Sequence, residues 1–256
     1  MTTRHVLILG GTGDARKLAD LLAVRSGLRI TLSLAGRTAT PLLPAVAIRS
    51  GGFGGAEGLA CWLREEQVDA LVDATHPFAA GISANAIDAA RHSGVPLIML
   101  ERPEWEQTAG DAWIEVDSIA EAAVALGNAP RTVFLAIGRQ ELAPFLAASQ
   151  HRYIVRSVDP VDPASRLPWA RYILARGPFD EIEERDLLVR FGVDIVVAKN
   201  SGGDATYGKI AAARNLHIPV VMVRRSATFG TARVARIEEI PEALHHALGL
   251  PAERGE

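Results

Sequence analysis

Hydrophobic residues fall in short continuous runs, and between the runs apolar residues recur at helical spacing. The first run, at 5–9, leads through glycines into a stretch in which Leu18, Leu21 and Leu22 lie on one helical face. Continuous apolar runs are typical of strands buried on both faces, and strands that alternate with helices form parallel sheets. The pattern therefore predicts an α/β protein in three layers, with helices on both faces of parallel sheets.

One strand-turn-helix-strand unit occurs twice along the chain. Segments 68–102 and 193–225 align with a gap of two residues, and in both an Ala-Ala-Arg helix end precedes an apolar run that opens at a proline. We infer an internal duplication that gives two similar domains of Rossmann-like or flavodoxin-like architecture. The polar segment 101–111 marks the boundary, so the first domain is expected to cover residues 1–102 and the second residues 111–250.

The first domain is predicted to contain five parallel strands in the order 3-2-1-4-5, numbered along the chain. Open parallel sheets bind ligands at the carboxyl ends of their strands. We therefore expect the loops at 74–78 and 199–203, which are equivalent in the two copies, to line one cleft between the domains. The alternative is that both loops are ordinary strand-to-helix turns.

The turn after the first apolar run reads GGTGDAR at 10–16 and stands between a predicted strand and a predicted helix. Glycines at this place let the backbone approach a diphosphate, and the helix N-terminus supplies free N–H donors. The match to the dinucleotide-binding pattern is incomplete, because Arg16 stands where a third glycine is usual, and a plain glycine turn is the alternative. The candidate cofactor-binding residues of this turn are Gly11, Thr12, Gly13, Asp14, Ala15 and Arg16.

The end of the second predicted strand indicates which nucleotide is bound. NADH usually meets a carboxylate there, but this chain has Gly36, Arg37 and Thr38. A guanidinium and a hydroxyl suit a 2′-phosphate, so NADPH is the expected cofactor. The alternative is that Arg37 is a solvated surface residue.

Two further loops of the first domain are candidates for the same site. Phe53 stands among glycines, and its ring either covers the cofactor or anchors the loop in the core. His76 follows a buried strand, and the proline after it disfavours helical geometry, which presents the imidazole in the loop. The candidate cofactor-binding residues of these loops are Gly52, Phe53, Gly54, Thr75, His76 and Pro77.

Several predicted strands of the second domain end in a cationic residue. Together these arginines and a lysine form a basic rim that is expected to attract a ligand with several carboxylates or phosphates. The alternative is that each cation is solvated or paired with an acid. The candidate substrate-binding residues are Arg139, Arg156, Arg176, Lys199, Asn200, Ser201 and Gly202.

The composition argues against several classes of function. The chain of 256 residues has 27 Lys and Arg against 30 Asp and Glu, so it lacks the broad basic field of a nucleic-acid or membrane-binding protein. A single cysteine excludes an internal disulfide framework, and neither a signal peptide nor a long apolar run is present. We expect a cytoplasmic protein, a monomer or weak oligomer, with no metal site and a small-molecule ligand.

The chain resembles the precorrin-6A reductase family of cobalamin biosynthesis over nearly its whole length. The matching motifs are GGTGDAR at 10–16, AGRT at 35–38, GGFGGAEGL at 51–59, DATHPFA at 73–79, AIGRQEL at 136–142, ARGPF at 175–179 and KNSGG at 199–203. The resemblance implies a two-domain α/β reductase that uses NADPH to reduce one double bond of the precorrin-6A macrocycle, giving precorrin-6B. The acetate and propionate groups of this tetrapyrrole fit the predicted basic rim.

If the reaction needs a protein acid, His76 and Lys199 are the catalytic candidates, because both are expected on loops of the cleft. Three other functions stay open. The substrate could be cobalt-precorrin-6A of the anaerobic pathway, or the enzyme could be another NADPH reductase of a polyanionic substrate. A two-lobed binding module is the third, although it would need a signal peptide or an effector segment.

Overall fold

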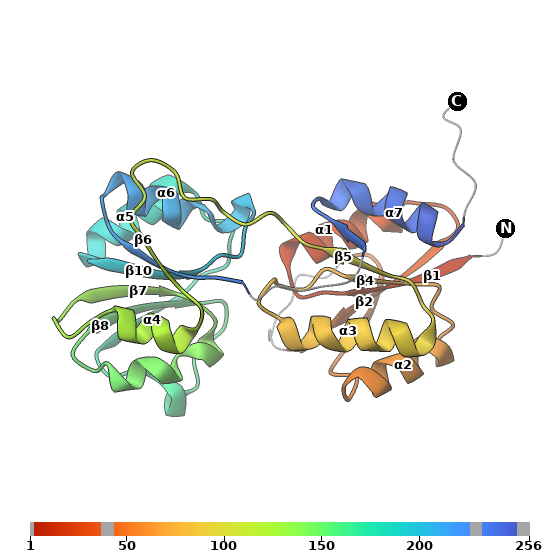
Figure 1. Cartoon of the computed structure of the whole chain (residues 1–256), viewed down its shortest axis with the longest axis horizontal. Coiled ribbons are helices and arrows are strands. Elements are labelled where there is room, and N and C mark those ends of the chain that lie inside the picture. The colour runs from red at the N-terminus through yellow and green to blue at the C-terminus, as the bar shows by residue number, and fades with distance from the viewer. Residues whose placement is uncertain (1–2, 37–43, 226–231, 250–256) are drawn as a thin grey trace. The chain divides into compact units, whose positions relative to one another are not determined.

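The computed structural model describes residues 3–36, 44–225 and 232–249 (Figure 1). The chain forms two compact units, one of residues 1–102 with 227–256 and the other of residues 103–226. Each unit is an α/β domain around a six-stranded sheet in which every recorded pairing is parallel. The predicted fold class, with two similar parallel-sheet domains, is confirmed.

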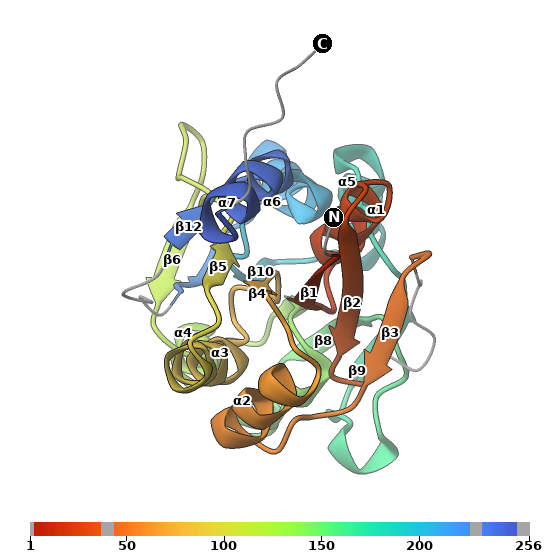
Figure 2. The ribbon, with the colours of Figure 1, turned by 90° about the vertical axis from the view of Figure 1, so that its right-hand side faces the viewer.

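The first domain begins with β1 (Arg4–Leu9), α1 (Gly13–Ala23), β2 (Leu28–Leu34) and β3 (Ala47–Ser50). It continues with α2 (Ala56–Glu65), β4 (Ala70–Asp73), α3 (Ala80–Ser93) and β5 (Leu97–Leu100). The C-terminal segment adds β12 (Ala232–Val234) and α7 (Ile240–Ala247). The sheet order is β12-β5-β4-β1-β2-β3, which Figure 2 shows side by side, so the predicted order of the first five strands is confirmed.

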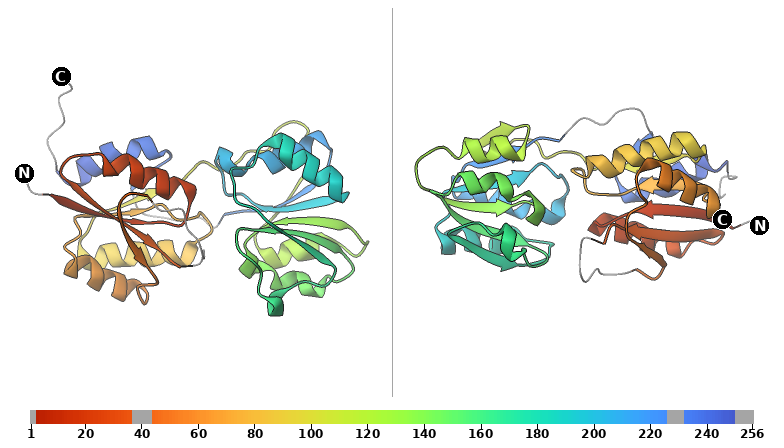
Figure 3. Two further views of the ribbon diagram at one scale, coloured as in Figure 1. Left: turned by 180° about the vertical axis from the view of Figure 1, so that it is seen from behind. Right: turned by 90° about the horizontal axis from the view of Figure 1, so that it is seen from below.

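Alternate residues of each central strand fill two cores, one on each face of the first sheet. Val6 and Ile8 of β1 pack with α1 and α7, whereas Leu7 and Leu9 pack with α2 and α3. Figure 3 shows these two helix layers above and below the strands. Because both faces are covered, the strands read as continuous apolar runs, which is the signal that predicted a parallel sheet.

The second domain contains β6 (Trp113–Val116), α4 (Ile119–Ala125), β7 (Thr132–Ala136), β8 (Arg152–Ser157) and β9 (Ala170–Leu174). It continues with α5 (Glu181–Phe191), β10 (Ile195–Lys199), α6 (Gly208–Asn215) and β11 (Val220–Val223). Short 3-10 turns stand in place of helices between β7 and β9. The order β6-β11-β10-β7-β8-β9 repeats that of the first sheet.

The C-terminal segment corrects the predicted domain boundary. Residues up to 250 were assigned to the second domain, but β12 pairs with β5 of the first sheet. Ile240 and Leu244 of α7 are buried in the core beside α1. Likewise β6, which follows β5 along the chain, pairs with β11 of the second sheet. Each half of the chain therefore gives its last strand and helix to the other domain.

The duplication extends to single hydrogen bonds. Glu121 accepts a bond from the Asp117 N–H at 3.0 Å, and Glu239 accepts one from the Ala235 N–H at 3.0 Å. Both glutamates close the turn between an edge strand and the helix that follows it, an arrangement that satisfies otherwise free N–H groups. The same glutamate-to-backbone hydrogen bond in both halves of the chain supports their descent from one duplicated unit.

Within the part of the chain that the structure describes, no helix has both the length and the apolar character needed to cross a membrane.

Candidate functional site

Four turns leave the first sheet at one edge. Leu9 of β1 is in register with Ser33 of β2 and with Asp73 of β4, so these strands end side by side. The Gly10 N–H donates to the Ser33 carbonyl at 2.9 Å, and the Ala74 N–H donates to the Leu9 carbonyl at 3.0 Å. The carboxyl ends of β1, β2, β3 and β4 consequently share one edge of the sheet, where parallel sheets bind ligands.

The glycine turn is built around Thr12, the N-cap of α1. Its hydroxyl accepts from the Ala15 N–H at 3.0 Å and donates to the Ala74 carbonyl at 2.9 Å. A methyl group on Gly10 would lie 2.6 Å from Leu32, so this glycine is needed for close packing. In contrast, the space beside Gly11 and Gly13 is open to 4 Å. The turn therefore has a packed side and an open side.

The structure also places three of the other predicted residues of this turn. Asp14 lies in the first helical turn and pairs with Arg102 at 2.7 Å. Ala15 is fully buried, and its N–H is already donated to the Thr12 hydroxyl. Arg16, at the place of the missing third glycine, is partly exposed on the helix. The turn keeps the helix N-terminus, and its positive dipole end, at the edge of the sheet.

Asp73, which the sequence did not single out, organises the loop after β4. This carboxylate is buried and accepts from the Thr75 hydroxyl at 2.7 Å and from the Ser83 hydroxyl at 2.6 Å. The Phe78 N–H donates to the His76 imidazole at 3.2 Å. Thr75, His76 and Pro77 are all partly exposed. A buried acid with a hydroxyl residue two positions later is the signal that could have identified this turn.

The loop after β3 is held by Arg49. Its guanidinium lies 3.6 Å from the centre of the Phe53 ring and donates to the carbonyls of Gly51 and Gly52 at 2.6 and 2.9 Å. The ring also packs edge-to-face with Trp62 of α2, with centroids 5.6 Å apart. Phe53 therefore anchors its loop, since one ring face is covered by Arg49 and the ring packs edge-to-face with Trp62. Its place in the cofactor site stays a prediction.

Two other glycines of this edge have backbone angles that suit glycine. Gly36 and Gly54 have φ of 71° and 81°, in the left-handed region that side chains rarely adopt. Gly36 is exposed at the end of β2. The predicted 2′-phosphate residues Arg37 and Thr38 lie outside the described residues.

In the second domain, Lys199 and Glu141 meet at the carboxyl ends of β10 and β7. The Lys199 ammonium donates to both carboxylate oxygens, at 3.0 and 2.8 Å, and its side chain is 14% exposed. Arg139, in the same turn as Glu141, donates to the Pro160 carbonyl at 2.8 Å and lies 3.9 Å from Asp159. Arg176 is exposed beyond the end of β9. These three predicted cations therefore share the carboxyl edge of the second sheet.

Arg156 does not belong to an exposed rim, which corrects the prediction. It is 8% exposed and forms a two-pronged ion pair with Glu184, which is 2% exposed. The rings of Phe179 and Phe134 lie 3.6 and 5.0 Å from its guanidinium. The sequence showed a cation near a strand end, but the side chain points to the core beneath α5, where only a paired charge is tolerated.

Two residues of the predicted KNSGG loop act in packing, which is a second correction. The Asn200 side chain is buried and bonds both to the N–H and to the carbonyl of Trp105, at 2.8 and 2.9 Å. A methyl group on Gly202 would lie 2.0 Å from the Pro103 carbonyl. Ser201 is also buried, with its hydroxyl 3.5 Å from that of Thr206. This loop therefore fastens the segment that enters the second domain.

Comparisons with known proteins agree with this architecture. Residues 5–246 match the family model described as Precorrin-6x reductase CbiJ/CobK. The chain belongs to this family. It is an oxidoreductase, and the resemblance noted from the sequence is confirmed.

Individual relatives are similar over almost the whole chain. A precorrin-6A reductase from Sinorhizobium sp is 53% identical, covering 97% of this chain and 95% of its own. A cobalt-precorrin-6A reductase from Priestia megaterium is 30% identical, covering 93% and 97%. The solved structure described as CobK precorrin-6A reductase is 42% identical, with a TM-score of 0.92 over 99% of this chain and 100% of that one.

Proposed function

We propose that the protein reduces one double bond of metal-free precorrin-6A, with NADPH as the hydride donor, to give precorrin-6B. The observation that carries this proposal is the family membership over residues 5–246, together with an open glycine turn at a helix N-terminus. The more similar relatives are precorrin-6A reductases, and the cobalt-precorrin-6A reductase from Priestia megaterium shares 30% identity against 53% for the Sinorhizobium protein. The metal-free ring is therefore the favoured substrate.

The carboxyl edge of the first sheet fits a dinucleotide. The open side of Gly11 and Gly13 leaves room for a diphosphate against the backbone, and N–H groups of the first helical turn have no acceptor within the helix. Bound NADPH supplies the hydride. The protein holds the cofactor at this edge through Gly11, Thr12 and Gly13, while Thr75, His76 and Pro77 stand on the neighbouring loop.

Arg37 and Thr38 are proposed to hold the 2′-phosphate, because no carboxylate is present at 35–38. Calorimetric titration tests this with NADPH and NADH, on the wild type and on Arg37→Ala. We expect NADPH to bind more tightly than NADH, and the variant to lose most of that preference. Equal affinity of the variant and the wild type for NADPH would remove Arg37 from the site.

The substrate carboxylates are proposed to lie against the carboxyl edge of the second sheet. Arg139, Arg176 and Lys199 are there, and guanidinium and ammonium groups are the natural partners of acetate and propionate. Arg156, Asn200 and Gly202 are left out of this proposal, because their side chains or packing serve the domain core. Ser201, although buried, offers a hydroxyl in the same loop.

His76 and Lys199 are the proposed proton donors. Reduction adds a hydride and a proton, and an imidazole or an ammonium on a loop at a sheet edge can deliver the proton. The Lys199 ammonium is held in place by Glu141, so its direction is fixed by two hydrogen bonds. The protein otherwise orients the two reactants and limits water, which is the main task of a protein in cofactor chemistry.

Turnover with defined substrates tests the proposed reaction. NADPH consumption is followed with precorrin-6A and, separately, with cobalt-precorrin-6A, and the product is identified by mass. We expect efficient reduction of precorrin-6A and slower reduction of the cobalt form. Faster turnover of the cobalt form would overturn the choice of substrate, and no turnover of either would overturn the proposal.

A further inference from the structure

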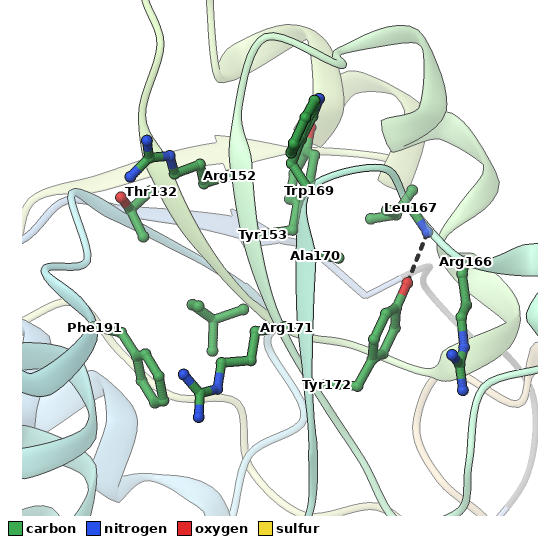
Figure 4. Close-up of a pocket in the computed structure, with 11 residues that line it drawn as sticks. Thr132, Arg152, Tyr153, Arg166, Leu167, Trp169, Ala170, Arg171, Tyr172 and Phe191 are labelled. Atoms are coloured by element: carbon green, nitrogen blue, oxygen red, sulfur yellow. Dashed lines mark hydrogen bonds between the residues drawn. The ribbon is translucent and has the colours of Figure 1, made fainter.

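A hollow of about 520 Å³ lies at the amino ends of β7, β8 and β9 (Figure 4). Thr132 begins β7 and is in register with Arg152, which begins β8, and the next β8 residue, Tyr153, pairs with Ala170 at the start of β9. Lys199 and Glu141 stand at the carboxyl ends of the strands of this sheet. The hollow is therefore at the opposite edge of the sheet from the proposed substrate residues.

Three arginines line the hollow, and none has a carboxylate partner among the residues that the structure describes. Arg152, Arg166 and Arg171 are all exposed. Arg166 lies 5.4 Å from the centre of the Tyr172 ring, and Arg171 lies 5.1 Å from that of Phe191. The Tyr172 hydroxyl accepts from the Leu167 N–H at 2.7 Å, as Figure 4 shows, which fixes this ring. Arg166 and Arg171 thus lie near aromatic rings, which stabilise the guanidinium groups without neutralising their charge.

Trp169 adds a flat apolar surface beside these cations. Its side chain lines the hollow but is 79% exposed. Its φ is 55°, which is unusual for a bulky residue. The Tyr153 N–H donates to its carbonyl at 3.2 Å, so the strained residue is tied to the sheet while the indole stays in solvent. Strained backbone of this kind concentrates at ligand clamps and other functional places.

We propose that this hollow binds a planar aromatic anion. The ring lies on the Trp169 indole, because offset stacking on an exposed aromatic face is favourable. Its carboxylate or phosphate groups bind Arg152, Arg166 and Arg171, whose guanidinium groups favour such planar oxyanions. Tetrapyrrole carboxylates and nucleotide phosphates share this chemistry.

Tryptophan fluorescence tests the proposal with two probes, uroporphyrin I for the carboxylated macrocycle and ATP for the nucleotide. Both are titrated into the wild type, Trp169→Phe, Arg171→Gln and the double variant Arg166→Gln, Arg171→Gln. The matched control is Arg185→Gln, an equal loss of charge at an exposed position of α5 that does not line the hollow. Turnover of NADPH is measured on each variant, so that damage to the proposed reductase site is detected separately.

We expect at least one probe to quench fluorescence, with affinity reduced roughly tenfold or more in the double variant and unchanged in the control, a change of about 1.4 kcal/mol or more. Reductase activity should be unchanged. Saturation by uroporphyrin I alone assigns the site to a tetrapyrrole, and saturation by ATP alone assigns it to a nucleotide. The proposal is overturned if neither probe binds, or if the variants bind both as the wild type does. Ultracentrifugation of Trp169→Ser tests the alternative that the hollow is a contact between copies of the chain. If this variant loses a dimer that the wild type forms, and neither probe binds the wild type, the proposal is overturned in favour of that contact.

Discussion

The hydroxyl of Thr12 donates to the carbonyl of Ala74 at 2.9 Å, joining the glycine turn after β1 to the loop after β4. The same oxygen caps α1 by accepting from the Ala15 N–H. One side chain thus fixes the helix N-terminus and sets its position relative to the loop that carries Thr75 and His76. The proposed cofactor site depends on both bonds.

Thr12→Val should therefore weaken both stability and cofactor binding. Valine keeps the shape but neither donates nor accepts, and loss of an N-cap costs about 1 kcal/mol. We expect a lower free energy of unfolding in urea and a weaker NADPH affinity by calorimetry. Thr12→Ser retains the hydroxyl and is the matched control. If Thr12→Val binds NADPH as well as Thr12→Ser, the turn does not hold the cofactor.

Gly13→Ala should weaken NADPH binding without lowering the stability of the fold. The added methyl would meet nothing within 4 Å, and alanine is favourable within a helix. We expect unchanged or slightly higher thermal stability, with NADPH affinity reduced by roughly tenfold or more, about 1.4 kcal/mol. Gly10→Ala is the converse control, because its methyl would clash with Leu32 and should lower stability. Normal NADPH affinity in Gly13→Ala would place the diphosphate elsewhere.

The proton donor can be found by comparing His76→Ala with Lys199→Ala. Removal of a general acid lowers turnover by about 10²- to 10⁴-fold, while binding of NADPH to a site on the other domain should be unaffected in Lys199→Ala. We expect one of the two variants to show this loss in kcat under saturating substrate. Near-normal kcat in both would show that solvent supplies the proton and would remove both from the catalytic role.

Lys209 is a buried charge that the sequence did not reveal. It is 4% exposed, its ammonium lies 4.7 Å from the centre of the Trp105 ring, and it donates to the Thr206 carbonyl. Its pKa is lowered to about 7, chiefly by burial, with the nearby Arg156 acting in the same direction and Glu184 opposing it. The folded protein therefore favours the neutral amine more than the unfolded chain does.

The sign of the pH effect follows from proton binding. Between pH 7 and the ordinary lysine pKa of 10.5, the unfolded chain binds more protons at Lys209, so the free energy of unfolding should rise with pH by up to about 1.4 kcal/mol per unit. Below pH 7 the cost of burying the charge is present in full. Urea unfolding of the wild type and Lys209→Met across this range measures the difference. Lys209→Met should be relatively more stable at low pH, and parallel curves for the two proteins would contradict the burial of a titrating amine.

The alternation of buried runs and helices was sufficient to predict the parallel sheets and the strand order of the first domain. It could not assign β12 and α7, because a strand as short as Ala232–Val234 has no recognisable apolar run, and its pairing partner depends on the tertiary fold. The repeat was visible in segments 68–102 and 193–225, but the exchange of the last strand and helix between the halves is a tertiary property. That the domains enclose a common cleft stays a prediction.

Site residues were harder to predict than the fold because residue type does not fix side-chain direction. Arg156 and Lys199 both stand near strand ends, yet Arg156 turns into the core to pair with Glu184 and Lys199 pairs with Glu141 at the edge. Asn200 stood in a motif with a polar turn, but it bonds the backbone of Trp105, which is remote in sequence. The conformation of the glycine turn was easier to predict. Glycines between a strand and a helix indicate a tight turn at the helix N-terminus, whichever way the neighbouring side chains point.

Isotope transfer tests whether the hydride of NADPH reaches the precorrin-6A ring. Precorrin-6A is incubated with the protein and NADPH that carries deuterium in place of the transferable hydrogen, and the macrocycle is isolated and analysed by mass spectrometry and NMR. We expect precorrin-6B with one deuterium on a carbon of the ring system and one further hydrogen from solvent. A reduced macrocycle without deuterium, or no reduction at all, would contradict direct hydride transfer from NADPH to this substrate.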